Sequence, residues 1–273
     1  MLKYIILITK KQPERLEELE KQCKNQGVSF FYVLPEWETK IGETLYITDE
    51  VNIFQGLWEE GANVLVWLHE ENKTESFQNA EYLLERIEEA EFDYLEKIYQ
   101  RLQDLPWLIR ETKRCRIREM TEKDLEQIYW IYSGESITKY MEGLYEDREE
   151  EQAFLRSYIE QAYKFYGYGT WVIEEKEKSV LIGRVGFNLR EGYEEPELGF
   201  VIAEEYQRQG YAYECCKAVI KYAKEELGFT TIQTLVREEN ENSKALCRKL
   251  GFVKKEIVVW EKEEYLRFIR ILD

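Results

Sequence analysis

The stretch Glu197-Leu-Gly-Phe-Val-Ile-Ala-Glu-Glu-Tyr-Gln-Arg-Gln-Gly-Tyr-Ala212 decides the fold of the chain around it. Its apolar run at 198–203 predicts a strand, its polar run at 204–209 predicts a turn, and a helix begins directly after Gly210. Where a strand turns tightly into a helix, several backbone N–H groups lack partners and point the same way, which suits an anion. Gly210 permits a positive φ, and the small Ala212 leaves room at the helix N-terminus. The stretch therefore predicts a site for a pyrophosphate group.

Regular patterns continue on both sides of this stretch. Period-two alternation predicts strands, apolar residues spaced three and four apart predict helices, and Gly228 and Gly251 are placed to end two of these helices. The predicted strands are 114–120, 170–174, 180–189, 231–236, 253–260 and 264–271, and the predicted helices are one capped by Thr121, 148–166, 211–227 and one running from Asn240 to Gly251.

Two spaced motifs in this order resemble a known family. The first is Gln207-x-x-Gly210-x-Ala212, and the second is Asn240-x-x-Ser243-x-x-Leu246-x-x-Lys249-x-Gly251-Phe252. Residues 113–273 resemble the GNAT N-acetyltransferase superfamily, and within it the Rim-type subgroup of ribosomal-protein N-terminal acetyltransferases. The resemblance implies an α/β (α+β) mixed-sheet domain that uses acetyl-coenzyme A as cosubstrate.

The resemblance also implies which residues hold acetyl-coenzyme A. Backbone groups of Phe200, Val201 and Ile202 would pair with the pantetheine arm, where the strand ending at Ala203 diverges from the strand ending at Val236. Asn240 and Ser243 would hold the cofactor or the start of their helix. The pyrophosphate would lie on the loop and helix start formed by Gln207, Arg208, Gln209, Gly210, Tyr211 and Ala212.

Direct attack of an amine on a thioester needs a group that removes the ammonium proton and an acid for the departing thiolate. Glu197 matches a glutamate of Rim-type sequences and is the candidate base or amine-orienting carboxylate, although a salt bridge would use it equally well. Glu194 and Glu195 are less well placed, because Pro196 separates them from the strand. For the acid, many family members have a tyrosine where this chain has Cys247, so Ser243 and Cys247 are the candidates.

The predicted function is therefore acetyl-coenzyme A-dependent acetylation of a primary amine, on a small molecule or a protein N-terminus. The departure at Cys247 leaves a non-catalytic acyl-coenzyme A sensor as the alternative. Tyr132, Tyr140, Tyr145 and the aromatic run at 163–168 are candidates for an acceptor pocket, although aromatic residues at helical spacing also form cores.

Residues 1–110 lie outside this resemblance and predict an accessory domain. Strand-like runs at 2–9, 28–34, 45–48 and 64–68 alternate with helical patterns, which indicates a small parallel sheet. Acidic helices are predicted at 81–91 and 92–103, and the domain boundary near Arg110. The segment that ends at Asp49 faintly resembles a degenerate haloacid-dehalogenase-like fold without its Asp-x-Asp nucleophile. A silent α/β module is the preferred interpretation, and phosphate chemistry through Asp49 is the weaker one.

Composition restricts the partners. A net charge of −17 disfavours nucleic acid and anionic membranes and would attract a cationic acceptor, although it also serves solubility alone. Five scattered cysteines and a single histidine, His69, show no metal-ligand spacing, so no metal is expected. No apolar run reaches the length of a membrane span, and a cytoplasmic location is expected. The oligomeric state is left open.

Overall fold

The computed structural model describes residues 1–33, 40–141, 143–260 and 262–272. The chain forms two compact units, Met1–Leu105 and Pro106–Asp273. The division falls slightly before Arg110, because Leu108–Glu111 forms a strand (β6) that pairs with the next strand of the second unit. Among the described residues, no helix combines the length and apolar character that a membrane-spanning helix requires.

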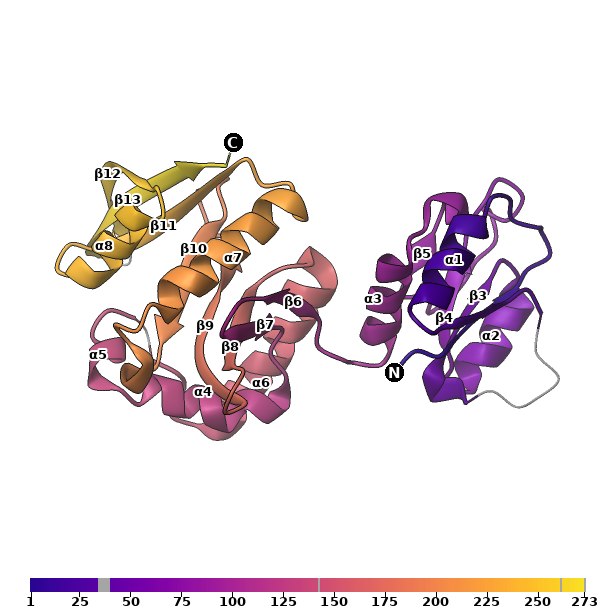
Figure 1. The fold of residues 1–273 in the computed structure, drawn as a ribbon, viewed down its shortest axis with the longest axis horizontal. Helices are drawn as coiled ribbons and strands as arrows, with labels where there is room; N and C mark the ends of the chain where they lie inside the picture. The colour runs from indigo at the N-terminus through magenta and orange to yellow at the C-terminus, as the bar shows by residue number, and fades with distance from the viewer. Residues whose placement is uncertain (34–39, 142, 261, 273) are drawn as a thin grey trace. The chain divides into compact units, whose positions relative to one another are not determined.

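The first unit is a five-stranded, wholly parallel sheet in the order β2-β1-β3-β4-β5 (Figure 1). Buried runs such as Ile5–Leu7 are typical of strands covered on both faces. One apolar cluster lies beneath α1 and α3 and a second beneath α2. The elements are β1 (Tyr4–Ile8), α1 (Glu17–Asn25), β2 (Ser29–Phe31), β3 (Thr44–Thr48), α2 (Val51–Glu59), β4 (Asn63–Trp67), β5 (Leu83–Leu84) and α3 (Phe92–Leu102).

The parallel sheet predicted for this unit is confirmed, but the helix predicted at 81–91 is wrong. Leu83–Leu84 pairs in parallel with β4 as the edge strand β5, and only a 3₁₀ turn, Ile87–Glu89, follows it. The acidic composition favoured a helix, whereas burial of Leu84 and Ile87 in the core decided the outcome. Of the strand predicted at 28–34, Leu34 lies outside the described residues.

The second unit is an eight-stranded mixed sheet in the order β12-β13-β11-β10-β9-β8-β7-β6. Its strands are β6 (Leu108–Glu111), β7 (Cys115–Arg118), β8 (Thr170–Glu175), β9 (Val180–Asn188), β10 (Glu197–Ile202), β11 (Thr231–Arg237), β12 (Val253–Trp260) and β13 (Glu263–Ile271). Its helices are α4 (Leu125–Tyr132), α5 (Glu135–Thr138), α6 (Arg148–Tyr158) with a π-helical continuation at Ile159–Tyr166, α7 (Tyr211–Glu225) and α8 (Glu241–Lys249).

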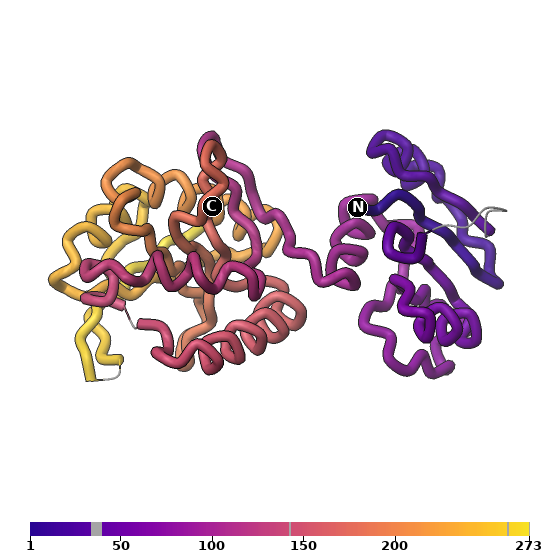
Figure 2. The backbone as a smooth tube through the Cα atoms, turned by 90° about the horizontal axis from the view of Figure 1, so that it is seen from below, coloured from indigo at the N-terminus to yellow at the C-terminus, as the bar shows by residue number. Residues whose placement is uncertain are grey.

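Helices cover opposite faces of this sheet. Tyr222 of α7 packs against Trp171 of β8 with ring centroids 5.6 Å apart. On the other face, Tyr132 of α4 lies against Arg184 of β9, whose cross-strand partner is the neighbour of Trp171. Because successive side chains of a strand point to opposite faces, α7 covers one face and α4 the other. Figures 1 and 2 show α4 and α6 together on the side opposite α7.

The start of the α4 region depends on a buried ion pair. The carboxylate of Asp124 accepts two hydrogen bonds of 2.8 Å from the guanidinium of Arg118 and one of 2.7 Å from the N–H of Thr121. We expect Asp124→Ala to lower the free energy of unfolding by about 3 kcal/mol, because the partly buried guanidinium loses its bidentate partner. Thermal and urea unfolding would measure this loss.

The matched control is Glu126→Ala on the same helix, whose ion pair with Arg148 is exposed. An exposed pair contributes under about 1 kcal/mol. Equal losses for the two variants would contradict the importance given to Asp124.

Candidate active site

The central feature of the second unit is a fork between two parallel strands. β10 and β11 are in register only at Glu197 and Gln233. Beyond that pair, β10 stays with β9 and β11 stays with β13. The backbone groups of Phe200 and Ile202, which point away from β9, therefore have no strand partner on the β11 side among the described residues, whereas those of Val201 point toward Arg184 of β9.

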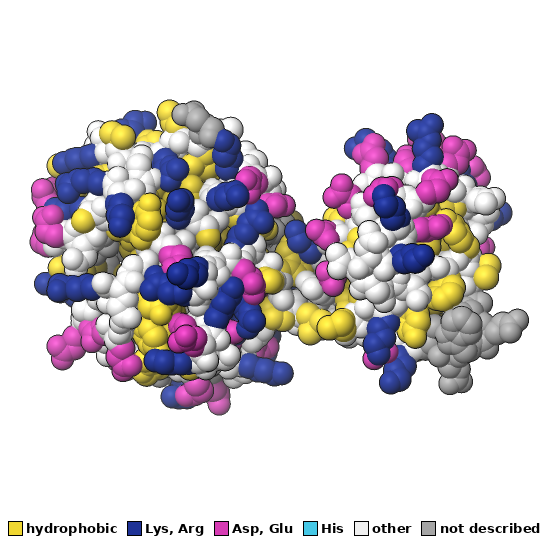
Figure 3. Space-filling view, in the orientation of Figure 1, with side chains coloured by type: hydrophobic (Ala, Val, Ile, Leu, Met, Phe, Trp, Pro, Cys, Tyr) yellow, Lys and Arg dark blue, Asp and Glu magenta, His cyan; other side chains and the backbone are white. Residues whose placement is uncertain are grey.

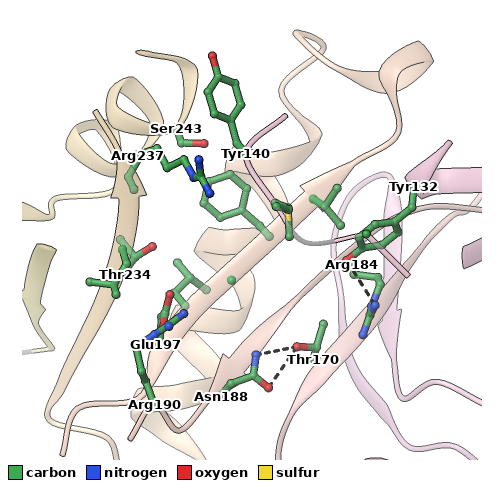
Figure 4. A pocket seen from close by; sticks show the side chains of 18 of the residues that line it. Tyr132, Tyr140, Thr170, Arg184, Asn188, Arg190, Glu197, Thr234, Arg237 and Ser243 are labelled. Carbon is green, nitrogen blue, oxygen red and sulfur yellow. Dashed lines mark hydrogen bonds and ion pairs between the residues drawn. The ribbon is translucent and has the colours of Figure 1, made fainter. Parts of the chain in front are cut away.

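A cavity of about 830 Å³ opens at this fork, on the face that α4 and α6 cover. Five residues predicted to act at the site line it, namely Glu197, Phe200, Val201, Asn240 and Ser243. Figure 4 labels Glu197 and Ser243 among them. Tyr132, Tyr140 and Tyr145 also line it, whereas Tyr163 is buried in the core. The structure thus brings the head of β10, the start of α8 and the α4–α6 connection to one space.

Glu197 lies at the point where the strands part. Its carboxylate forms an ion pair with Nε of Arg190, and the Arg190 guanidinium lies 4.6 Å from the ring centroid of Trp260. The Glu197 side chain is 14% exposed, so the carboxylate is shielded but still lines the cavity. The arginine partner limits the rotation of the carboxylate, which suits a group that positions an ammonium ion.

The loop before α7 has the geometry of an anion site. Gly210 has φ 84° and Arg208 has φ 58°, two left-handed residues that turn successive N–H groups to one side. No side chain of the described residues caps the N-terminus of α7, so the first-turn N–H groups keep their hydrogen-bonding capacity. The side-chain amide of Gln207 donates to the carbonyl of Ile202 at 3.0 Å, which ties the loop back to β10.

Arg114, which the sequence did not single out, braces this loop. Its Nη1 donates to the carbonyl of Gln209 at 3.0 Å, its Nη2 lies 2.7 Å from Glu214, and its guanidinium lies 4.0 Å from the ring centroid of Tyr211. Arg208 is exposed and free to turn toward an anion. Residues 207–212 and Ile202 are not among those that line the cavity, so loop and cavity are separate parts of the fork region.

The candidate residues of α8 lie in two different environments, the start of the helix and the core. Asn240 caps the helix, since its Oδ1 accepts from the N–H of Ser243 at 3.1 Å, and Ser243 lines the cavity. Arg237 and Tyr140 line the same cavity, and Figure 4 labels them with Ser243. Cys247 lies one turn further on, fully buried and away from the cavity, and burial raises the pKa of its thiol to about 12.

Asp49 lies at the carboxyl end of β3, as expected, and is fully engaged. Its carboxylate accepts from the backbone N–H groups of Lys10 at 2.7 Å and Lys11 at 2.9 Å, and lies 3.1 Å from Nε2 of His69. These contacts connect the loops that follow β1, β3 and β4 at one end of the parallel sheet. The resemblance of this unit to haloacid-dehalogenase-like folds stays a hypothesis.

Sequence patterns missed several polar residues that line the cavity, among them Arg184, Asn188, Arg190 and Arg237. Arg184 and Asn188 share one face of β9, so two polar residues four positions apart within a predicted strand were the available signal. The pairing of Arg190 with Glu197 had no local signal, because it depends on the turn between β9 and β10.

Comparison with known proteins identifies the family of this chain. Residues 114–253 match the family model described as Acetyltransferase (GNAT) domain. The chain is 33% identical over 154 residues to the uncharacterized N-acetyltransferase YoaA of Bacillus subtilis (strain 168), a match that covers 55% of this chain and 85% of YoaA.

Two solved structures show the same fold. A ribosomal-protein-S5-alanine acetyltransferase from Vibrio fischeri is 18% identical with a TM-score of 0.52, and the match covers 62% of this chain and 97% of that one. A spermidine N-acetyltransferase chimera from Vibrio cholerae and hSSAT is 22% identical with a TM-score of 0.50, covering 58% and 96%. Together with the family-model match over half of its length, the fork, the anion loop and the strand order place this chain in the GNAT acetyltransferase family.

Proposed function

We propose that the chain transfers an acetyl group from acetyl-coenzyme A to a primary amine, on a small molecule or a protein N-terminus, by direct attack. The observation that carries this proposal is the position of Glu197, a shielded carboxylate at the fork of β10 and β11 that also lines the cavity. A carboxylate attracts the ammonium form of an amine and orients it toward the fork.

The residues present fit acetyl-coenzyme A. The N–H groups of residues 208–212 would hold the pyrophosphate, since Gly210 and Arg208 are left-handed and no capping side chain lies on α7 within the described part of the chain. Where β10 has no strand partner on the β11 side among the described residues, the backbone groups of Phe200 and Ile202 would pair with the pantetheine arm. Bound there, acetyl-coenzyme A would supply a thioester, whose carbonyl carbon is the electrophile.

The residues of this chain would then manage two protons. Glu197 would orient the amine and take its proton, directly or through a water. As the new C–N bond forms and the C–S bond breaks, the hydroxyl of Ser243 would give a proton to the departing sulfur and recover one from solvent. Cys247 keeps its proton at neutral pH, but its burial places it outside this relay.

This assignment separates two candidate acids by mutation. We expect Ser243→Ala to lower kcat about tenfold to a hundredfold, because a cavity hydroxyl is lost. Cys247→Ala should change kcat less than about threefold and instead destabilise the core, because a buried thiol is removed. Release of free thiol from acetyl-coenzyme A in the presence of amines measures both. A Cys247→Ala loss larger than that of Ser243→Ala would reverse the assignment.

The same assay tests the function itself. The alternative is a non-catalytic acyl-coenzyme A sensor, favoured by the burial of Cys247 at the position where many family members have tyrosine. A sensor binds acetyl-coenzyme A but releases no thiol with any member of a panel of peptides, polyamines and aminoglycosides. Thiol release above the amine-free rate would exclude the sensor, and its absence across the panel would exclude the enzyme.

We also propose that the N-terminal unit is an accessory module and that the protein is cytoplasmic. Asp49 follows β3 and His69 follows β4. The Asp49 carboxylate is held by the backbone of Lys10 and by His69, so it is not a free nucleophile. All five cysteines are free and buried, which fits a reducing compartment.

A further inference from the structure

Arg184 is the feature of the cavity that the proposed chemistry does not use. It lies in the middle of β9, and its cross-strand partner on β10 is Val201. Cross-strand partners share a face of the sheet, so Arg184, Val201, Gly199 and Glu197 face the same side, toward α4 and α6. In the view of Figure 4, Arg184 and Tyr132 lie on one side of the cavity and Glu197 lies on the other.

Arg184 has no ion-pair partner among the described residues. Its Nε is buried without a hydrogen-bond partner, and its Nη1 makes one long contact of 3.4 Å to the hydroxyl of Tyr132. Glu151 also lines the cavity, but it influences Arg184 only from beyond ion-pair distance, and its Oε2 accepts from the N–H of Tyr145 at 2.9 Å.

The other two arginines of the cavity are paired. Arg190 forms its ion pair with Glu197, and Arg237 lies 3.5 Å from Glu263. Of the three arginines that line the cavity, Arg184 is therefore the one that forms no ion pair with a described residue. A partly buried guanidinium without a carboxylate is costly in the free protein, and a ligand that brings a negative charge removes that cost.

We propose that the acceptor amine carries an anionic group, a carboxylate or a phosphate, which binds Arg184 while the amine lies at Glu197. This inference rests on the proposed acetyl transfer and names the substrate class of the same cavity. The amine end of such an acceptor is cationic and the other end anionic, so the molecule matches both charged sides of the cavity. A linear polyamine would place a second ammonium near Arg184 and be repelled.

The floor between the two charges is open. Asn188 is the cross-strand partner of Glu197, and Arg184 lies four positions earlier on β9, which separates the two backbone positions by roughly 13 Å. Gly199 lies between them, and a Cβ added there would meet no atom of the described residues within 4 Å. The acceptor can therefore extend along β10 between the two charges without displacing a side chain.

The bulk charge of the protein does not oppose this assignment. The net charge is −17, yet on the face of the second unit seen in Figure 3 lysine and arginine side chains stand among the acidic ones. An ionic contact inside a cavity depends on the groups within a few ångströms, because salt screens charges beyond about 10 Å.

Calorimetry on the full chain saturated with coenzyme A tests the inference through binding rather than turnover. The probes are ε-aminocaproate, its primary amide and hexamethylenediamine, which share a chain length and differ in terminal charge. We expect the acid to bind at least about tenfold more tightly than the amide, the contribution of one charge-assisted hydrogen bond, and the diamine to bind most weakly.

Arg184→Gln should abolish the preference for the acid, and Arg184→Lys should keep part of it. Arg156→Gln is the matched control, since this exposed arginine on α6 pairs with Glu122 and lies outside the cavity. Because no carboxylate among the described residues lies within ion-pair distance of Arg184, its replacement breaks no ion pair, and the melting temperature should stay level or rise. A fall with no change in ligand preference would show a purely structural role and overturn the inference.

Further arms identify the source of the anion. Phosphoethanolamine against γ-aminobutyrate distinguishes phosphate from carboxylate, and an Ala-Asp peptide amide against an Ala-Asn one tests an acidic protein N-terminus. Equal affinities for acid and amide, no binding of the acid, or a preference that survives Arg184→Gln would each overturn the inference. If the preference holds but no amine releases thiol, the anion subsite stands and the proposed acetyl transfer fails.

Discussion

Replacement of Glu197 by glutamine should lower kcat/KM for the acceptor about a hundredfold to a thousandfold, while the affinity for acetyl-coenzyme A changes less than about twofold. The glutamine keeps the shape of the side chain but neither attracts an ammonium nor takes its proton. It also leaves the Arg190 guanidinium without its partner beside the amine. Thiol release measures the turnover, and calorimetry with acetyl-coenzyme A measures the cofactor affinity.

Glu256→Gln is the matched control for this variant. Glu256 is also paired with an arginine, Arg267, at 2.7 Å in the same sheet, but it does not line the cavity. The control should retain full turnover. If Glu197→Gln kept turnover within about threefold of the unmodified protein, the carboxylate would have no part in the reaction, and water or another group would remove the proton.

Gly210→Trp should weaken acetyl-coenzyme A binding at least about a hundredfold. Gly210 has φ 84°, where a side chain costs about 1–2 kcal/mol. A Cβ there would meet only Nη2 of Arg114, at 3.6 Å, so the fold has room for the side chain. The indole would instead cover the N–H groups at the start of α7, and these are the groups proposed to bind the pyrophosphate.

Gly228→Trp separates the loss of the site from backbone strain. Gly228 also has a positive φ, 67°, near the other end of α7, and a Cβ there would meet no atom within 4 Å. Both variants should lose similar stability in thermal unfolding, but only the Gly210 variant should lose the cofactor in calorimetry. Equal affinities for acetyl-coenzyme A in the two variants would place the pyrophosphate elsewhere.

Most elements of the second unit followed from local sequence patterns. The helix predicted at 211–227 is α7 (Tyr211–Glu225), and the closing hairpin at 253–260 and 264–271 is β12 and β13. Such elements depend on periodicity and end signals within one segment. The helix predicted at 81–91 is wrong for the opposite reason. Pairing of this segment with β4, a distant part of the chain, overrode an acidic composition that favours a helix.

The features of the candidate site also fall into those set by local sequence and those set by tertiary contacts. The left-handed Gly210, the turn into α7 and the cap that Asn240 provides for α8 were determined by the sequence alone, because backbone conformation and helix capping are set by neighbours in the chain. The fork after Glu197, the withdrawal of Cys247 into the core and the uncompensated charge of Arg184 were decided only by the tertiary structure. Strand divergence, burial and ion pairing all depend on groups that are distant in sequence, and no local pattern records which of them will meet.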